Sequence, residues 1–284
     1  MDVKNHNMNK EKPIMRKRFR IIAFLAFFFG IVMAVSQYFE FVSKTVYEES
    51  VSHLTEVFHQ SDNMLGELTH KNLMYLHMWS EYLQDAPSES KIRDYIDKAQ
   101  KDAGFLYFYL LSADGNYKMT TGETGYLGLQ ENFEDEIQNG NDIVTNAAVP
   151  GKSQMLVFAS PKAHGSYQGF KYDAIAIAYE NADIVNVLDI SAFNGKAKSY
   201  VLHPDGRVVI DHSLESWGNV YNFFGILREH TDISEKEILE ISKKFKEGHT
   251  GAMLLNLDGK DYYLVYEKSD IQDWVFLGLV QADI

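Results

Sequence analysis

The sequence predicts an α+β fold in which a long N-terminal helix is followed by two similar modules of antiparallel strands. Two observations carry this prediction. Apolar residues recur at helical spacing as far as residue 84, with no proline between residues 14 and 86. Beyond residue 104 the spacing changes to the alternation of strands, and a hairpin with an Asp-Gly turn recurs 91 residues later.

The run from Ile21 to Phe39 predicts one transmembrane helix. It has 19 residues, and its first 15 carry no charged or strongly polar side chain. About 20 such residues cross a bilayer core of roughly 30 Å. Residues 1–20 hold seven Lys or Arg against two acidic residues, so we expect this basic tail in the cytoplasm and residues 40–284 outside the cell membrane.

A cleaved signal peptide is the alternative reading of this run, because residues 34–36 could serve as a cleavage site. We favour an uncleaved anchor for two reasons. Aromatic residues follow the apolar run at the level of a headgroup belt, and the helical pattern continues directly beyond it.

The charge balance and the lack of cysteine exclude several classes of function. The first 20 residues contribute +5 to a formal net charge of −13, so the rest of the chain carries −18. Such an acidic region is a poor nucleic-acid binder. A chain with no cysteine has no disulfide, no catalytic thiolate and no cysteine zinc site. Hydrophobic residues at 45% and aromatic residues at 13% are typical of a folded protein.

Residues 40–103 are expected to form a long extracytoplasmic helix and a second, shorter one at residues 91–102. The apolar stripe of the long helix repeats at about 3.5 residues. Its members are Tyr47, Val51, Leu54, Phe58, Leu65, Leu68, Leu76, Trp79 and Leu83. Such a stripe packs either against its own domain or against a second copy of the chain, and we expect a homodimer through this helix.

Two modules follow, at residues 104–192 and 193–284. The strands expected in the first are residues 105–111, 117–119, 142–149, 154–160 and 172–179. Residues 122–140 are expected to form a loop and a short helix. The strands expected in the second are those of the hairpin at residues 200–210 and residues 251–256, 262–267 and 274–280. The expected helices are residues 182–188, 222–229 and 234–247, the last with a capping box of Ser234 and Glu237.

The two modules look like copies of one another. The segment YLLSADGNYKM at residues 109–119 matches YVLHPDGRVVI at residues 200–210, and residues 177–184 match residues 277–284 in the same order. In the first copy this second match leads into a helix, whereas the given sequence stops there in the second. We therefore expect the sequence to be a fragment that continues toward a second membrane crossing.

These features together resemble the double Cache sensor family, in which a membrane anchor and a long helix precede two PAS-like modules in tandem. The resemblance covers residues 40–284 and rests on the order of elements and on the segments YVLHPDGRVVIDH and WVFLGLVQADI. It implies a small-molecule ligand in the membrane-distal module and a cytoplasmic output domain. The amino-acid-binding subset of that family carries a Tyr…Arg-x-Trp-Tyr…Asp signature, which is missing here because no arginine lies between Arg93 and Arg207.

No motif in the sequence predicts catalysis or a metal site. The segment Pro150-Gly151-Lys152-Ser153 lacks the upstream glycine of a phosphate loop, because position 146 is an asparagine. His70 and His77 lie too far apart on one helix to hold the same ion. We therefore expect no catalytic residue, no metal and no cofactor in this chain.

The candidate ligand-binding residues lie in the first module. Strand alternation places Tyr107 and Tyr109 on one face of their strand. Asp173 continues the otherwise apolar face of a later strand, so its carboxylate could hold a ligand cation with tyrosines around it. The alternative is that Asp173 lies near water at the strand end and that the tyrosines belong to the core.

Three further candidates, at the expected mouth of the pocket, are Tyr126, Asn146 and Ser153.

The resemblance thus implies the ligand-sensing region of a bacterial transmembrane receptor. On the frequency of output domains in that family, we expect a histidine kinase of a two-component system, with a diguanylate cyclase or a chemotaxis receptor as alternatives. An anchored surface binding protein is the rival from another class. An anchored hydrolase would need a nucleophile–base pair or a metal site, and the sequence shows neither.

Overall fold

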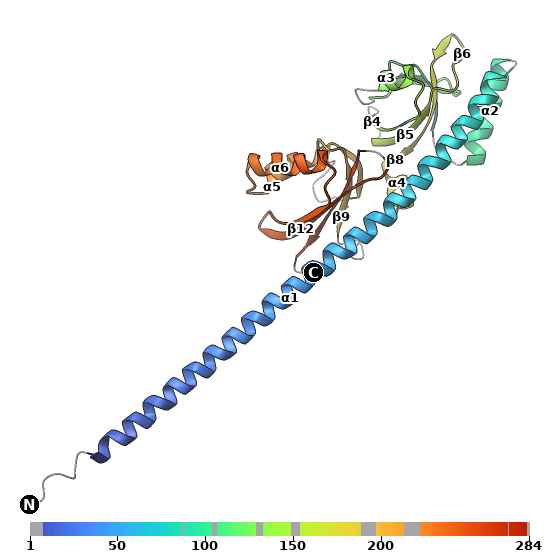
Figure 1. The fold of residues 1–284 in the computed structure, drawn as a ribbon. Helices are drawn as coiled ribbons and strands as arrows, with labels where there is room; N and C mark the ends of the chain where they lie inside the picture. Colours follow the sequence, from blue (N-terminus) through green and yellow to red (C-terminus); the bar gives the residue numbers. More distant parts are fainter. Residues whose placement is uncertain are drawn as a thin grey trace, which may run out of the picture. The chain divides into compact units, whose positions relative to one another are not determined.

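The computed structural model describes residues 8–86, 88–103, 107–128, 133–148, 154–188, 197–212, 222–271 and 273–282 (Figure 1). The chain forms two compact units, Met1–Ser50 and Val51–Ile284. Helix α1 (Met8–Gln84) begins in the first unit and ends in the second, and α2 (Glu89–Ala103) follows it. The predicted α+β fold, with a long N-terminal helix followed by antiparallel sheet modules, is confirmed.

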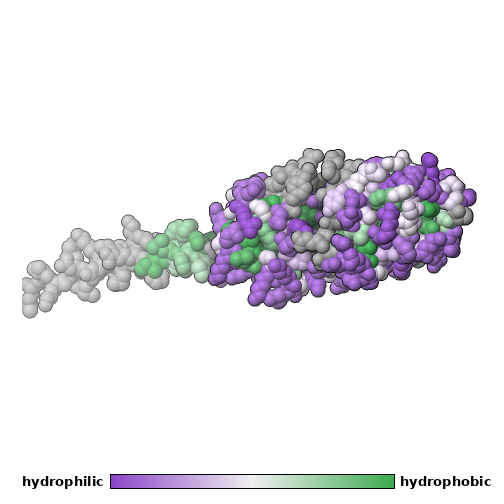
Figure 2. Space-filling view, turned by 90° about the horizontal axis from the view of Figure 1, so that it is seen from above, coloured by the Kyte–Doolittle hydropathy of each residue, from purple (hydrophilic) through white to green (hydrophobic). Residues whose placement is uncertain are grey.

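The N-terminal part of α1 has the surface expected of a membrane helix. Among the described residues, one helix is long and apolar enough to cross a membrane, judged by length and composition. Its phenylalanines are exposed, including Phe24 at 68% and Phe27 at 69%. Figure 2 shows this segment as a continuous hydrophobic surface, whereas the visible face of the second unit is mostly hydrophilic.

The first module (described residues 107–188) is built on an antiparallel sheet with strand order β3-β2-β1-β8-β5-β4. These strands are β1 (Tyr107–Leu111), β2 (Asn116–Lys118), β3 (Thr124–Tyr126), β4 (Ile143–Ala148), β5 (Gln154–Ser160) and β8 (Ala174–Glu180). A separate hairpin and two short helices complete the module: β6 (Gly165–Tyr167), β7 (Phe170–Tyr172), α3 (Phe133–Gln138) and α4 (Asn181–Leu188).

The three strands that the sequence did not predict, β3, β6 and β7, have only three residues each. Such strands are too short to show an alternating pattern. The β6–β7 hairpin is closed by Gln168 and Gly169, which both have a positive φ, at 48° and 74°. This is the backbone of the two-residue turns that match the twist of a hairpin.

The second module (described residues 197–282) is a five-stranded antiparallel sheet with order β10-β9-β13-β12-β11. Its strands are β9 (Lys198–Leu202), β10 (Val208–His212), β11 (Gly251–Leu257), β12 (Lys260–Lys268) and β13 (Val275–Gln281). Two helices, α5 (Phe223–His230) and α6 (Glu235–Lys246), bury their apolar sides against one face of this sheet. The predicted capping box of Ser234 and Glu237 is present at the start of α6.

The two modules share one topology. The order β2-β1-β8-β5-β4 in the first equals β10-β9-β13-β12-β11 in the second, with β3 added at the edge of the first. The two Asp-Gly turns are also equivalent: Gly115 and Gly206 have φ values of 85° and 86°. Each glycine N–H donates to the carbonyl three residues earlier, at 2.9 and 2.8 Å.

The second sequence match is one residue out of register. Tyr109 pairs with Ala176 in β8, and its equivalent Tyr200 pairs with Leu277 in β13. The spacing between Ala176 and Leu277 is 101, whereas the sequence match implied 100. A one-residue shift moves every side chain of a strand to the opposite face, so the pairing, and not the sequence similarity, shows which residues are equivalent.

Residues 51–84 of α1 pack along one face of both sheets (Figure 1). In the first module, the hydroxyl of Tyr179 donates to Asn72 Oδ1 at 2.9 Å. In the second, Phe58 stacks on Phe276 with ring centroids 5.9 Å apart. A Cβ on Gly278 would lie 2.7 Å from the Phe58 ring and 2.9 Å from Leu54, so β13 and the helix meet where there is no side chain.

Two asparagines of the first module join it to β10, the edge strand of the second sheet. The amide of Asn181 donates to the carbonyl of Asp211 at 2.8 Å and accepts from its N–H at 3.0 Å. The amide of Asn146 donates to the carbonyl of Val208 at 3.2 Å. Side-chain amides therefore take the hydrogen bonds that a further strand would otherwise make at this edge.

Two glycine substitutions should have opposite effects on stability. Gly278→Ala should lower the free energy of unfolding by about 1–3 kcal/mol, because the new methyl group overpacks the contact with Phe58 and Leu54. Gly225→Ala, inside α5, has no atom within 4 Å of the added carbon and should stabilise by up to about 1 kcal/mol. Urea unfolding of both variants checks this, and equal effects would contradict the close helix–sheet contact.

Glu267, near the end of β12, has a carboxyl pKa above its ordinary value. Burial raises this pKa most, Asp62 and Asp270 raise it further, and His59 lowers it. Its Oε2 atom is buried and has no hydrogen-bond partner among the described residues. Because the folded-state pKa is raised, stability is lost as pH rises through that pKa.

Glu267→Gln should therefore raise the melting temperature at neutral pH, and the gain should disappear at about pH 3, below the unfolded-state pKa of about 4.3, where the carboxyl is protonated in both states. Differential scanning calorimetry across this pH range measures the effect. Glu240→Gln, on the exposed side of α6, removes the same charge and serves as the control. A gain that persists in acid would show that charge burial is not its cause.

Candidate ligand-binding site

The inner face of the first sheet, opposite to α1, carries a cluster of tyrosines. Strand pairing sets Tyr107 across from Ala178 and Tyr109 across from Ala176, which places both tyrosines on one face. Tyr117 on β2 lies across from Leu111 and joins the same face. Tyr109 is fully buried among apolar residues of this face, and its hydroxyl lies 3.8 Å from Met155 Sδ.

We define the tyrosine cluster as Tyr107, Tyr109 and Tyr117 with the carboxylates of Glu123 and Glu180. The rings of Tyr107 and Tyr109 are stacked with centroids 5.9 Å apart, and Tyr117 meets Tyr109 edge-on at 4.7 Å. The hydroxyl of Tyr107 donates to Glu180 at 2.9 Å, and that of Tyr117 donates to Glu123 at 3.0 Å. Both carboxylates are thus held at the rim of an aromatic surface.

The carboxylates around the cluster disfavour negative charge on its tyrosines. The pKa of Tyr107 is raised by its hydrogen bond to Glu180, then by burial, and further by the charges of Glu180, Glu123 and Asp183. Burial raises the pKa of Tyr117, with a further increase from the bond to Glu123. Three acidic groups that oppose one phenolate would stabilise a cation at the same place.

The inner face of the first module carries smaller side chains on its central strands than the inner face of the second. Ala174, Ala176 and Ala178 of β8 occupy the positions of Val275, Leu277 and Leu279 of β13, as the pairing to β1 and β9 shows. On the next strand, Ala159 stands where the second module has Tyr266. The second module fills its face with large aliphatic and aromatic residues under α5 and α6, whereas the first places tyrosines over alanines.

Among the residues suggested by the sequence, only Tyr107 and Tyr109 belong to this cluster. Tyr126 on β3 is 55% exposed and lines a shallow pocket of about 570 Å³ together with Tyr117 and Lys171. Asn146 lies at the junction of the two modules. Ser153 is outside the described residues. The ligand-binding roles of these residues remain predictions.

The structure does not bring Asp173 to the two tyrosines. Asp173 immediately precedes β8, and alternation places it on the side of Ile175 and Ile177, which faces away from Tyr109. Its carboxylate accepts from the backbone N–H of Ala113 at 3.1 Å and lies 3.4 Å from Lys171 Nζ. These contacts tie the β1–β2 turn to the start of β8.

Sequence reasoning did not select Tyr117, Glu123 or Glu180. A signal for Tyr117 was present, because a two-strand register around Asp114-Gly115 sets it opposite Leu111, on the Tyr109 face. Gly125 also reflects this packing, since a Cβ there would lie 2.7 Å from the Tyr117 hydroxyl. The position of Glu180 beside Tyr107 depends on the β1–β8 pairing, which joins residues 73 apart.

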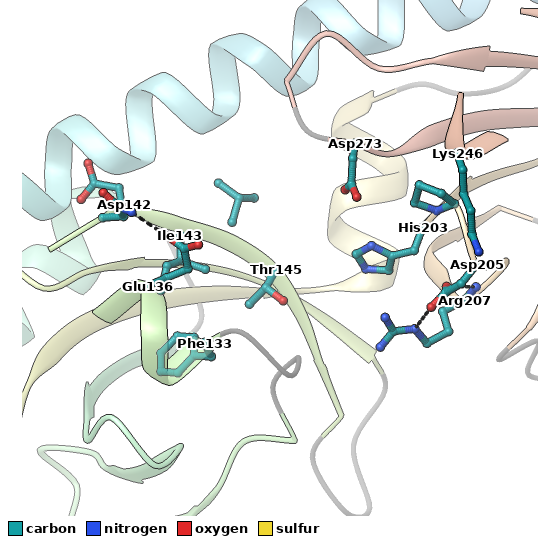
Figure 3. Close-up of a pocket in the computed structure, with 13 residues that line it drawn as sticks. Phe133, Glu136, Asp142, Ile143, Thr145, His203, Asp205, Arg207, Lys246 and Asp273 are labelled. Atoms are coloured by element: carbon teal, nitrogen blue, oxygen red, sulfur yellow. Dashed lines mark hydrogen bonds and ion pairs between the residues drawn. The ribbon is translucent and has the colours of Figure 1, made fainter. Parts of the chain in front are cut away.

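A second feature is an open cleft of about 980 Å³ between the two modules, which we call the intermodule cleft (Figure 3). Its first-module wall comes from α3 and β4, with Glu136, Asp142 and Thr145. Its second-module wall comes from the β9–β10 turn, α6 and the segment before β13. This wall includes His203, Asp205, Arg207, Lys246 and Asp273.

His203 is the most buried titratable group of the cleft, with 6% of its surface exposed. Its ring meets that of Trp274 edge-on at 6.0 Å, and its Nε2 lies 3.3 Å from Asn146 Oδ1. Burial lowers the pKa of His203 most; Arg207 lowers it further, whereas Asp205 and Asp273 raise it. A neutral imidazole therefore faces the junction at neutral pH.

Metal binding finds no support in the described part of the chain, where no group of three His, Cys, Asp or Glu side chains could hold an ion.

Comparison with known proteins gives the fold. No protein-family model matches this chain, and no curated protein matches it in sequence. Among solved structures, the extracellular domain assigned to the histidine kinase mmHK1S-Z3 is similar, with TM-score 0.58 and 13% identity over 84% of this chain and 96% of that one.

Two chemoreceptor domains are also similar. The sensory domain of Campylobacter jejuni Tlp3, with isoleucine bound, has TM-score 0.52 and 11% identity over 86% of this chain and 97% of that one. The ligand-binding domain of Pseudomonas aeruginosa PctB, in complex with L-Gln, has TM-score 0.54 and 14% identity over 83% and 91%. This chain has a Cache-type sensor fold. The resemblance stated from the sequence is therefore confirmed for the fold.

The charges around His203 should move its pKa in opposite directions. Asp273→Asn should lower that pKa, and Arg207→Gln should raise it, because the first change removes an anion and the second a cation. Nuclear magnetic resonance titration of the histidine rings measures both. Asp94→Asn, on α2, is the control. A pKa that shifts in the same direction in both variants would contradict the described surroundings of His203.

Proposed function

We propose that this chain is the extracytoplasmic ligand-sensing region of a bacterial transmembrane receptor. We further propose that its first module binds a small molecule with an ammonium group at the tyrosine cluster. One observation carries the proposal: three packed tyrosines and two carboxylates lie on the inner face of a Cache-type sensor module. Aromatic faces and carboxylates together are the usual recognition elements for an organic cation.

The difference between the modules supports the choice of the first. Its inner face has alanines where the second has leucine, valine and tyrosine. Because a ligand needs volume over the sheet, the module with small side chains is the better candidate. The second module, whose face is covered by α5 and α6, suits a structural role between the sensing module and the membrane.

The chemical class of the ligand follows from charge. The structural neighbours include domains with amino acids bound, which carry an ammonium group. This chain has no arginine between Arg93 and Arg207 to hold a carboxylate in the first module. Amines without an obligatory carboxylate are therefore the preferred class, and amino acids the second.

The signal would travel through α1. The inner-face strand β8 also carries Tyr179, whose hydroxyl contacts Asn72 of α1 from the opposite side of the sheet. A ligand that changes the position of β8 would thus act on the helix that leads toward the membrane. It can shift the receptor only by the difference between its affinities for the two states.

The remaining parts of the proposal concern partners and output. The membrane would be crossed by residues 21–39. A second copy of the chain would pack along α1, where Met64, Met74, Met78 and Tyr82 are 39–55% exposed. We rank a histidine kinase first as the output domain, with a diguanylate cyclase or chemotaxis receptor next, and a surface binding protein without output last. Sequencing the gene beyond the codon for Ile284 decides among these.

The ligand proposal is tested by thermal shift of the full chain in detergent against ethanolamine, cadaverine, agmatine and the standard amino acids. A ligand at about 100 times its dissociation constant should stabilise by roughly 2.7 kcal/mol. Glu180→Gln and Glu123→Gln should each weaken binding about tenfold, because each removes a charge-assisted contact. Calorimetric titration of the variants measures this.

Asp173→Asn is the matched control, since Asp173 is a carboxylate of the same module on the other face of the sheet. It should leave the affinity unchanged. If Asp173→Asn abolishes binding while Glu180→Gln does not, the cation is held at Asp173 and the tyrosine cluster is the wrong site. If no amine or amino acid shifts the melting temperature, the proposed ligand class is wrong.

A further inference from the structure

The intermodule cleft is separate from the tyrosine cluster, and no residue of that cluster lines it. Its volume of about 980 Å³ is at the upper end of the range of small-molecule pockets, about 300–1,000 Å³. Apolar surface comes from Phe133, Ile143 and Pro204, and neutral polar groups come from Asn141 and Thr145. The cleft therefore has the size and mixed lining of a binding site.

The charged groups of the cleft are divided between its walls. Among the described residues, the first-module wall holds the carboxylates of Glu136 and Asp142 and no cation. The two cations of the described lining, Arg207 and Lys246, belong to the second-module wall, where Asp205 and Asp273 also lie. A molecule that spans the cleft would thus meet anionic groups on one side and the cationic groups on the other.

The cations retain hydrogen-bonding capacity. Arg207 uses its Nε to donate to Asp205 at 2.7 Å, which leaves its two terminal nitrogens without a partner in the described part of the chain. Figure 3 shows the guanidinium directed toward the wall that carries Thr145. Lys246 has no hydrogen bond or ion pair with any described residue.

Of the two second-module anions, Asp205 is already engaged. It accepts from the side chain of Arg207 and, at 3.1 Å, from its backbone N–H. Asp273 forms no hydrogen bond or ion pair with a described residue, and its charge raises the pKa of His203. On the opposite wall, Glu136 accepts from Asn141 at 2.7 Å through one oxygen, and its other oxygen forms no hydrogen bond among the described residues.

We propose that the intermodule cleft is a second ligand site, for a small zwitterion the size of a short peptide. The ligand's carboxylate binds Arg207 and Lys246, and its ammonium group binds Glu136 on the opposite wall. A guanidinium with two unpartnered terminal nitrogens matches the two oxygens of a carboxylate.

Occupancy of this site links the two modules. The ammonium contact belongs to the first module and the carboxylate contact to the second, beside the Asn146 bonds to Val208 and His203. A bound zwitterion therefore adds to the junction between the modules and favours whichever receptor state holds the cleft at the matching width. The site is independent of the amine site at the tyrosine cluster.

Isothermal titration of the full chain in detergent tests the proposal with L-alanyl-L-alanine, its N-acetyl derivative and its C-terminal amide. The dipeptide should bind. Each derivative should bind at least about tenfold more weakly, because the N-acetyl group removes the ammonium charge and the amide removes the carboxylate charge. Arg207→Gln and Lys246→Gln should each weaken the dipeptide about tenfold and leave the residual affinity of the amide unchanged. Glu136→Gln should weaken the dipeptide but not the N-acetyl derivative.

Lys244→Gln, an exposed lysine on the same helix as Lys246, is the matched control and should have no effect. Circular dichroism of Lys246→Gln establishes that the fold is intact. The proposal is overturned if the dipeptide gives no saturable heat, or if the Arg207 and Glu136 variants bind it as tightly as the unsubstituted chain does. It is also overturned if Glu180→Gln alone abolishes binding, since the dipeptide would then occupy the tyrosine cluster.

Discussion

The packing of α1 along one face of both sheets is the constraint on which the rest of the second unit depends. It buries Leu54 and Phe58 against β13 and brings Asn72 to Tyr179 of β8. Since each sheet has only two faces and α1 covers one of them, each module has one remaining face, the inner face, on which other helices or a ligand can pack. In the second module α5 and α6 take that face, and in the first the tyrosine cluster does.

One duplicated topology thus supports two different interiors. The strand order and the Asp-Gly turn are the same in both copies, so the backbone is set by pairing and turn geometry. What differs is side-chain volume: alanine at positions 174, 176 and 178 against valine and leucine at their equivalents. The two modules therefore differ in the filling of the inner face and share the framework.

Most of the fold could be predicted from the sequence, because in long segments the spacing of apolar residues distinguishes a helix from a strand. The continuous helix to residue 84, the two Asp-Gly hairpins and the capping box of Ser234 all depend on local signals. The failures have physical reasons. Strands of three residues carry no period, and the one-residue shift between Ala176 and Leu277 follows from pairing across the chain. The binding site was harder to predict for the same reason. Glu180 reaches Tyr107 because β8 pairs with β1. Asp173 was selected because the sequence does not show that its side of β8 is opposite to the side that carries Tyr109.

The asparagine contacts at β10 bear on how this architecture can be divided. The backbone groups at the outer edge of that strand are bonded to Asn146 and Asn181, which belong to the other module. A second module cut free at residue 197 would keep its own sheet and helices but lose these caps. Its edge strand would then be open to pair with the same strand of a neighbouring molecule. Although the two copies share one topology, they are not interchangeable units: the second has an edge strand that only the first caps.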